Sequence, residues 1–348
     1  MQPIHSIQVL RALAAFMVAV HHVQPDAAVL AERAGIAFVR SDVLPWMAGV
    51  DIFFVVSGFI MVHASQDLFG RQGAPAIFLK RRLARIVPLY WATTTLFLLV
   101  GLAVPATLNS SAPNPAQILG SYLFWPVVST QGFVQPVYSL GWTLNYEMLF
   151  YLLFAAGLLL PKRWTLPAVA LLLAVLVGAE SLNGPLALPF GFWGQPIVLE
   201  FAAGMGIAVL RQKGLRLHGL LRIAVAAAGV AVLLAAADQP GTEGSWNSVL
   251  WRGGAAVLLM LAAGCGREGI VPAAPVKALA AVGDASYALY LVHPFVIRGM
   301  REAALRIGLY APLPYMVLAL AGSVVAALLL YRFFEKPATR LVRRWLRG

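Results

Sequence analysis

Arg11 and His22 are the residues whose types and spacing most directly suggest chemistry, and both lie in the apolar segment IQVLRALAAFMVAVHH, residues 7–22. On an α-helix, residues eleven apart lie within about 20° of the same face and about 16 Å apart along the axis. His21 falls about 80° off that line, so we expect His22 to be the functional histidine. An arginine is a permanent cation that binds anions, and an imidazole exchanges protons near neutral pH. The spacing predicts one helical face with these two groups toward opposite sides of an apolar layer.

Two arginines form a second candidate site. Arg82 and Arg85, in FLKRRLARIVPLYW, are three residues apart, so a helix would point both to one side. Guanidinium groups on one face suit bidentate phosphate binding. A basic cluster that anchors the cytoplasmic end of a membrane span is the competing interpretation, and without further support it is the stronger one.

Glu147 is a carboxyl group in apolar surroundings. It lies in SLGWTLNYEMLFYLLF with apolar or aromatic neighbours on nearly every side and no local cation. A carboxyl group in such a place either pairs with a distant Arg or His or stays protonated. We therefore treat Glu147 as a candidate site residue, with a structural pair between helices as the alternative.

Three further polar residues are weaker candidates. Asp51 enters the apolar segment GVDIFFVVSGFIM near its outer end, where a helix N-cap and a site role are equally good interpretations. Ser57 and Gly58 lie deeper, and close helix packing is the stronger interpretation for both. His293 directly precedes a proline near the outer end of SYALYLVHPFVI, where a lone histidine is more often an interfacial hydrogen-bond donor than a catalyst.

Composition defines the class of protein that must position these groups. Hydrophobic residues make up 60% of the 348 positions and charged residues 11%, with a mean hydropathy of +0.80. Soluble domains carry about 25% charged residues, so an all-α, polytopic membrane protein is predicted. The single cysteine, Cys265, excludes an internal disulfide framework and a zinc cluster, and no metal is expected.

Ten apolar stretches have about the length of a membrane span. They are residues 6–24, 47–64, 85–104, 140–160, 164–180, 194–211, 219–237, 247–264, 283–299 and 313–334. The shorter stretch 116–125 is expected at an interface or as a re-entrant segment. Prolines 25, 105, 161 and 189 are placed near span ends. Within the spans, the remaining ionisable residues are His21, Glu200, Arg252 and Asp284.

The basic residues predict the orientation. With both termini in the cytoplasm, 20 of the 26 Lys and Arg residues lie inside, as the positive-inside rule requires. The outer set is Arg33, Arg40, Arg252, Arg298, Arg301 and Arg306. The net charge of +12 is therefore a topology signal, and a nucleic-acid partner is not expected. The first segment is a retained span rather than a signal peptide. A short basic helix follows Glu335, residues 1–348 form one integral-membrane domain without an appended soluble domain, and no transporter-type repeat is seen.

The ordered motifs resemble the membrane-bound acyltransferase-3 family. They are Arg11 with ten residues before His22, then GVDIFFVVSGF, RRLARIVPLYW, SLGWTLNYEMLFY and SYALYLVHPFV. The resemblance covers essentially the whole chain, and the opening segment is most similar to the exopolysaccharide-modifying branch. It places the family's arginine–histidine pair on Arg11 and His22, its paired arginines on Arg82 and Arg85, and its acidic position on Glu147.

The resemblance implies an O-acyltransferase of the bacterial inner membrane, with acetyl-CoA as acyl donor. The acceptor would be a hydroxyl group of an extracytoplasmic carbohydrate, either an exopolysaccharide or a lipopolysaccharide unit. Arg11, Arg82 and Arg85 would then hold the phosphates of acyl-CoA at the cytoplasmic side. His22 would act as general base, oriented by Glu147 as in a catalytic triad. Covalent transfer through His22 is an alternative. A transporter of a lipid-linked sugar and a succinyltransferase on the same scaffold also remain open, and no oligomeric state is predicted.

The uncharged outer loop 105–139 is the expected entry for the acceptor. Sugars are bound by neutral hydrogen-bonding groups and aromatic faces, which this region offers in its Asn and Ser residues and in Trp125, Tyr138 and Trp142. Asp51, Ser57 and His293 are further candidates on the substrate side. A disordered connector is nearly as good an interpretation of the loop.

Overall fold

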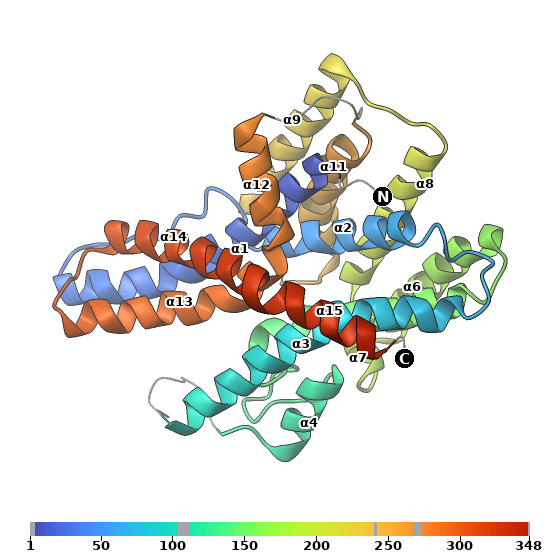
Figure 1. Ribbon diagram of the computed structural model, residues 1–348. Helices are drawn as coiled ribbons and strands as arrows, with labels where there is room; N and C mark the ends of the chain where they lie inside the picture. Colours follow the sequence, from blue (N-terminus) through green and yellow to red (C-terminus); the bar gives the residue numbers. More distant parts are fainter. Residues whose placement is uncertain (1–3, 104–111, 240–241, 267–272, 347–348) are drawn as a thin grey trace. The chain divides into compact units, whose positions relative to one another are not determined.

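The computed structural model describes residues 4–103, 112–239, 242–266 and 273–346, and within these ranges the chain is helical without a β-strand. The all-α prediction is confirmed for this part of the chain. The α-helices are α1 (His5–Ala34), α2 (Ala48–Ala64), α3 (Ala74–Ala103), α4 (Pro115–Leu123), α5 (Trp142–Gly157), α6 (Lys162–Asn183), α7 (Phe190–Trp193), α8 (Leu199–Gln212), α9 (Gly219–Ala235), α10 (Trp246–Ser248), α11 (Gly254–Gly264), α12 (Ala274–Asp284), α13 (Ser286–Arg306), α14 (Pro312–Leu330) and α15 (Lys336–Trp345) (Figure 1). Shorter 3₁₀ segments are η2 (Ser139–Gly141), η3 (Pro196–Val198) and η4 (Ala236–Asp238), and two π-helical segments are η5 (Val249–Gly253) and η6 (Tyr331–Glu335).

The chain forms two compact units. Unit 1 comprises Met1–Val62 and Ala203–Phe333, and unit 2 comprises His63–Ala202 and Phe334–Gly348. Each unit therefore combines segments that are far apart in the sequence. Most of the N-terminal and C-terminal motifs belong to unit 1, while the RRLAR and NYEM motifs belong to unit 2.

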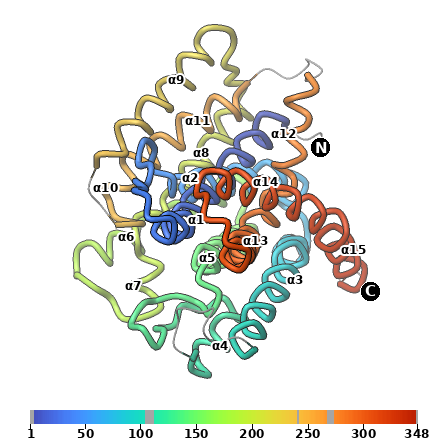
Figure 2. Tube along the Cα trace, turned by 90° about the vertical axis from the view of Figure 1, so that its left-hand side faces the viewer, coloured from blue at the N-terminus to red at the C-terminus, as the bar shows by residue number. Residues whose placement is uncertain are grey.

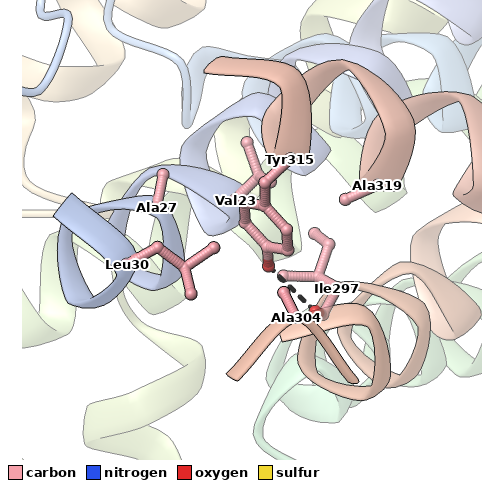
Figure 3. Packing of buried hydrophobic residues seen from close by; sticks show 7 residues of the cluster. All are labelled: Val23, Ala27, Leu30, Ile297, Ala304, Tyr315 and Ala319. Carbon is pink, nitrogen blue, oxygen red and sulfur yellow. Dashed lines mark hydrogen bonds between the residues drawn. The ribbon is translucent and has the colours of Figure 1, made fainter. Parts of the chain in front are cut away.

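Unit 1 is built around α1, which lies beside α13 and α14 in both views (Figures 1 and 2). Small and branched apolar side chains fill the space between these helices (Figure 3). The cluster consists of Val23, Ala27, Leu30, Ile297, Ala304, Tyr315 and Ala319. The Tyr315 hydroxyl donates a 2.9 Å hydrogen bond to the carbonyl of Ile297, which satisfies the only polar atom that this ring brings into the cluster.

Small residues let α1 contact its other neighbours closely. A Cβ atom on Gly283 of α12 would lie 1.9 Å from the carbonyl oxygen of Gln8, and one on Gly49 of α2 would lie 2.3 Å from that of Ala14. Both contacts are too close for any residue with a side chain. Backbone approach through glycine is typical of helix pairs in membranes.

The first helix is longer than predicted. The sequence suggested an end near Pro25, but α1 continues through this proline to Ala34. A proline inside a helix removes one hydrogen bond, here to the carbonyl of His21, and packing of the following turns against α13 and α14 outweighs that loss. The helix ends where Gly35 adopts φ 67° and Ile36 N–H bonds to the Ala31 carbonyl, a Schellman motif.

Six helical segments of the described residues are long and apolar enough to cross a membrane. They are His5–Ala34, Ala74–Ala103, Lys162–Asn183, Gly219–Asp238, Trp246–Gly264 and Pro312–Trp345, and α12 with α13 gives a seventh candidate bent by 74°. Three of the ten predicted spans coincide instead with α2, α5 and α8, which have 17, 16 and 14 residues. At 1.5 Å per residue these helices are about 21–26 Å long, shorter than a typical hydrocarbon layer of roughly 30 Å.

In unit 2, α5 packs against α3 and α6, and α15 packs along α3. α3 begins at Ala74, eleven residues before the predicted start of its span, so the helix includes both Arg82 and Arg85, as their spacing requires. α15 is the short basic helix expected after Glu335, and that prediction is confirmed. Pro161 is the N-cap of α6 and Pro189 precedes α7, whereas Pro105 falls outside the described residues.

Candidate active site

His22 and His293 face each other from α1 and α13 in unit 1. Their ring centroids are 5.1 Å apart, and His293 Nε2 lies 3.3 Å from His22 Nδ1. His293 is fully buried, His22 is half-buried and His21 is exposed. The helical face that carries His22 therefore points toward α13, and His293 lies in the interior of the unit rather than at an exposed end.

Hydrogen bonds to backbone carbonyls define the tautomers of the pair. His22 Nδ1 lies 2.9 Å from the carbonyl oxygen of Val18, and His293 Nδ1 lies 3.0 Å from that of Leu289. A carbonyl oxygen only accepts, so in the neutral rings each Nδ1 carries the proton. His293 Nε2 then has a lone pair that accepts from His22 Nδ1–H. The lone pair of His22 is left on Nε2, as a general base requires.

An ion pair one turn beyond the histidines connects the same two helices. Asp26 of α1 lies 2.6 Å from Arg301 and 4.0 Å from Arg298, both on α13. Arg301 also pairs with Glu302. A partly buried carboxylate between two guanidinium groups resists separation of the helices, and so helps to keep His22 against His293.

Asp51 and Arg252 form a buried ion pair elsewhere in unit 1. Arg252 Nε lies 3.7 Å from Asp51 Oδ2, and Nε also donates to the hydroxyl of Ser248 at 2.8 Å. Asp51 is in the first turn of α2, three residues after its start at Ala48, so it is not the N-cap. Its carboxylate instead offsets the charge of an arginine that a membrane interior would otherwise disfavour.

Arg11 and Ser57 are the other predicted site residues in unit 1. Arg11 Nη1 donates a 2.9 Å hydrogen bond to the side-chain carbonyl of Gln8, one turn earlier on α1. Because α1 is one continuous helix, Arg11 and His22 share a face, as the spacing predicts. Ser57 is half-buried on α2, and Gly58 beside it is buried.

Arg82 is the centre of a charged group in unit 2. Its side chain is buried, its guanidinium carbon lies 5.6 Å from the centroid of the Phe78 ring, and its Nε has no hydrogen-bond partner. The groups near enough to act electrostatically on it are Tyr151, Arg85, Glu147 and Arg343. A buried N–H of a permanent cation that lacks a partner is costly, and an anionic ligand would supply one.

Glu147 belongs to this charged group of unit 2. Its carboxylate accepts a hydrogen bond from the hydroxyl of Tyr151, one turn further along α5. Trp142 begins the same helix, and its ring makes an edge contact with Tyr146 at 5.9 Å between centroids. Glu147 and His22 lie in different units, so a direct action of Glu147 on His22 stays a prediction.

Cys265 is unsuited to nucleophilic catalysis. It is fully buried just after α11, and burial raises the pKa of its thiol against the opposing charges of Arg211 and Arg216. The thiolate is the reactive form, so a raised pKa makes the thiol inert near neutral pH. Among the described residues, no three His, Cys, Asp or Glu side chains are grouped as a metal site would need.

The sequence profile of the acyltransferase-3 family, described as an acyltransferase domain, matches residues 4–332. The chain belongs to this family. The chain is 36% identical over 305 residues to the exopolysaccharide production protein ExoZ of Rhizobium meliloti (strain 1021), covering 84% of this chain and 89% of ExoZ. It is 27% identical over 374 residues to the acyltransferase MdmB of Streptomyces mycarofaciens, covering 97% of this chain and 92% of MdmB. No solved structure gives a significant match.

This acyltransferase-3 protein is thus a multi-pass membrane O-acyltransferase. The sequence analysis did not predict several contacts of its candidate site residues. Tyr151 lies four residues after Glu147, so helical spacing was a usable signal. The Asp26–Arg301 pair and the approach of Arg343 to Arg82 join segments more than 200 residues apart, for which one sequence carries no signal.

Proposed function

We propose that the protein transfers an acetyl group from acetyl-CoA to a hydroxyl group of a carbohydrate that belongs to an exopolysaccharide, with His22 as general base. The observation that carries this proposal is the position of His22 Nδ1, which lies 2.9 Å from the carbonyl oxygen of Val18 and 3.3 Å from His293 Nε2. Val18 and His293 hold its Nδ1 proton and leave the lone pair on Nε2. The name of the relative ExoZ supports a polysaccharide acceptor.

The chemistry needs one proton acceptor and balances without a resident cofactor. His22 Nε2 takes the proton of the acceptor hydroxyl while its oxygen attacks the thioester carbonyl carbon. The tetrahedral intermediate then collapses, the carbon–sulfur bond breaks, and the proton passes from the imidazolium to the departing thiolate. The products are an O-acyl sugar and free CoA thiol. Neutral His22 is regenerated.

The arginines supply the donor side. Arg82 and Arg85 would hold phosphate groups of acyl-CoA, and the Arg82 Nε without a partner supports this assignment. Arg11 would hold a further phosphate at the near end of α1, so that the pantetheine arm extends toward His22. Guanidinium groups are the side chains best suited to bidentate phosphate contacts.

The positive-inside distribution supports a cytoplasmic donor site and an extracytoplasmic acceptor. In this arrangement both termini face the cytoplasm of a bacterial inner membrane. The chain then crosses that membrane about ten times, with α2, α5 and α8 as short additions to the longer spans. Local thinning of the bilayer accommodates helices of this length.

The test uses the purified protein in detergent with acetyl-CoA or succinyl-CoA and a deacylated exopolysaccharide. We expect release of CoA thiol and, by mass spectrometry, acetyl groups on the glycan. His22→Ala should lower transfer by about 10²–10⁴-fold, the usual contribution of a general base, and His21→Ala should retain most of it. Equal loss in both variants at normal abundance contradicts the assignment of His22.

Two other outcomes of this experiment would assign the protein a different function. Succinyl groups on the glycan would identify a succinyltransferase on the same scaffold. Intact folded protein that consumes neither thioester but moves a lipid-linked sugar across vesicles would identify a transporter.

A further inference from the structure

The C-terminal helix α15 has two faces of different chemistry. Lys336, Arg340 and Arg343 follow one another at i, i+4 and i+7, so they share one face of the helix. Leu341 and Trp345 lie on the other side and are 69% and 78% exposed. No acidic residue lies within α15. A basic amphipathic helix in a membrane protein lies at the membrane surface with its apolar face toward the lipid, so the basic face is turned away from the lipid tails.

The basic face of α15 lies close to Arg82 of α3, within unit 2. The two helices pack against each other and lie side by side in both views (Figures 1 and 2). Lys80 Nζ of α3 donates a 2.9 Å hydrogen bond to the carbonyl of Leu346, directly after α15. Arg343 is near enough to Arg82 for its charge to act there. Sequence-distant cations are thus brought together on two contacting helices.

These cations exceed the acidic groups beside them. Two guanidinium groups, those of Arg85 and Arg343, act on the buried Arg82, against one carboxylate, that of Glu147. The nearby Asp67 is already paired with Arg81 at 3.2 Å, and Glu335 is buried ahead of α15. Arg82 Nε is buried without a hydrogen-bond partner. Like charges gathered around an unpartnered donor favour an anion with several negative charges.

The exposure of these arginines orders such a ligand along the site. Arg82 is buried, Arg85 is half-buried, and Arg340 and Arg343 are exposed. Coenzyme A carries its thiol at one end, a pyrophosphate in the middle and a 3′-phosphate on the adenosine at the other end. A donor whose thioester enters the protein keeps its adenosine near the surface. The exposed arginines of α15 are therefore placed for the 3′-phosphate.

We propose that the basic face of α15 binds the 3′-phosphate of the acyl donor through Arg340 and Arg343, while the pyrophosphate stays with the donor arginines of the proposed function. The inference rests on that function, because it adds a subsite for the same donor. It makes α15 a specificity element that favours coenzyme A thioesters over phosphopantetheine thioesters without a 3′-phosphate. A guanidinium suits this role because it can hold a phosphate by two parallel hydrogen bonds.

The experiment measures donor binding without catalysis. Calorimetry on the purified full chain in phosphatidylcholine nanodiscs compares coenzyme A with 3′-dephospho-coenzyme A. We expect the wild type to bind coenzyme A about tenfold more tightly, the effect of one charge-assisted contact. Arg343→Gln should weaken binding of coenzyme A about tenfold and change that of the dephospho form by less than about twofold, because only the former makes the contact.

Two further variants complete the comparison. Arg340→Gln should reduce the preference for coenzyme A in the same way, and it tests the proposal if Arg343→Gln does not fold. The matched control is Arg163→Gln, which removes an exposed arginine of α6 in the same unit. Its guanidinium carbon lies 5.8 Å from the centroid of the Trp164 ring. Arg163→Gln should keep the full preference for coenzyme A.

An anionic lipid headgroup offers the same phosphate chemistry, so the measurements are repeated in nanodiscs that also contain phosphatidylglycerol. We expect the wild type to keep its preference there. If Arg343→Gln keeps this preference but loses stabilisation by phosphatidylglycerol in thermal unfolding, α15 binds lipid and the proposal is overturned.

The remaining outcomes separate this proposal from the proposed function. Wild-type protein that transfers acetyl groups but binds both coenzymes equally overturns the assignment of α15 and leaves the proposed function standing. Wild-type protein that binds neither coenzyme overturns the assignment as well. A preference for coenzyme A that depends on Arg343, in a protein that transfers no acyl group, refutes the proposed function and leaves the assignment of α15 standing.

Discussion

His293 offers the sharpest test of the histidine pair. Its Nε2 accepts from His22 Nδ1–H across 3.3 Å, while the Val18 carbonyl accepts from the same proton at 2.9 Å. His293→Leu removes the hydrogen-bond acceptor and places an apolar side chain, which suits a fully buried position, in its stead. His293→Gln keeps an acceptor oxygen at about the reach of Nε2. We therefore expect Leu to lower the rate of transfer and Gln to restore most of it.

The distance between His22 and His293 determines how large a loss of activity we expect in His293→Leu. A donor–acceptor separation of 3.3 Å is longer than the usual 2.9–3.0 Å or so, and the bond to Val18 survives the substitution. A neutral hydrogen bond contributes about 0.5–1.5 kcal/mol. At about 1.36 kcal/mol per tenfold change in rate, His293→Leu should lower kcat by about 2- to 12-fold. Loss of the base itself, in His22→Ala, should cost about 10²–10⁴-fold.

The assay is steady-state release of CoA thiol at saturating acceptor, with thermal unfolding as a check on folding. KM for acyl-CoA should stay within about twofold in every variant, because His293 does not contact the donor phosphates in this scheme. His218→Leu is the matched control, since His218 is exposed and removed from the pair. Two results refute the reasoning: a loss in His293→Leu as large as that in His22→Ala, or full activity in a folded Leu variant.

Three further predictions concern the donor site, the acidic residue and the packing of α1. Arg85→Lys should weaken acyl-CoA binding about tenfold, since a point charge replaces a bidentate fork worth roughly 1.5–3 kcal/mol per charged hydrogen bond. The control variant Arg71→Lys should bind acyl-CoA normally. Unchanged affinity with reduced abundance of Arg85→Lys would indicate that Arg85 is a topology anchor. Glu147→Gln should bind acyl-CoA but fail to transfer it, and normal transfer across the neutral pH range would make Glu147 a structural residue. Gly283→Ala should destabilise the protein by about 1–3 kcal/mol in thermal unfolding through the clash with Gln8, whereas Gly254→Ala, with open space around it, should not.

The sequence was a good guide to the identity of the helices and a poorer one to their ends. Hydrophobic periodicity identified α2 and α9 almost to the residue. It placed the end of α1 near Pro25 because proline lacks a hydrogen-bond donor, a local rule that tertiary packing overrides. It placed the start of α3 too late because charged residues lower the apolar signal, although arginine is a good helix former.

For the candidate site, spacing within one helix was informative and distance between helices was not. The shared face of Arg11 and His22 follows from the period of a single α-helix. The contact of His22 with His293 depends on how α1 and α13 pack, and the residues are 271 positions apart. Glu147 donates no proton to its neighbour Tyr151 but accepts one from it within α5, a contact that helical spacing could have suggested, and its action on His22 stays a prediction.

The unbroken stretch of α1 between Arg11 and His22 has a consequence for donor choice. No proline interrupts the helix between these residues, so the rigid helix fixes their separation at about 16 Å along its axis. In the proposed arrangement, a thioester donor must span that interval, with its phosphates at Arg11 and its sulfur near His22. A shortened pantetheine arm could not satisfy both at once. In this arrangement the acyl group lies beyond His22, so the interval between Arg11 and His22 limits the length of the donor's arm and not the size of its acyl group.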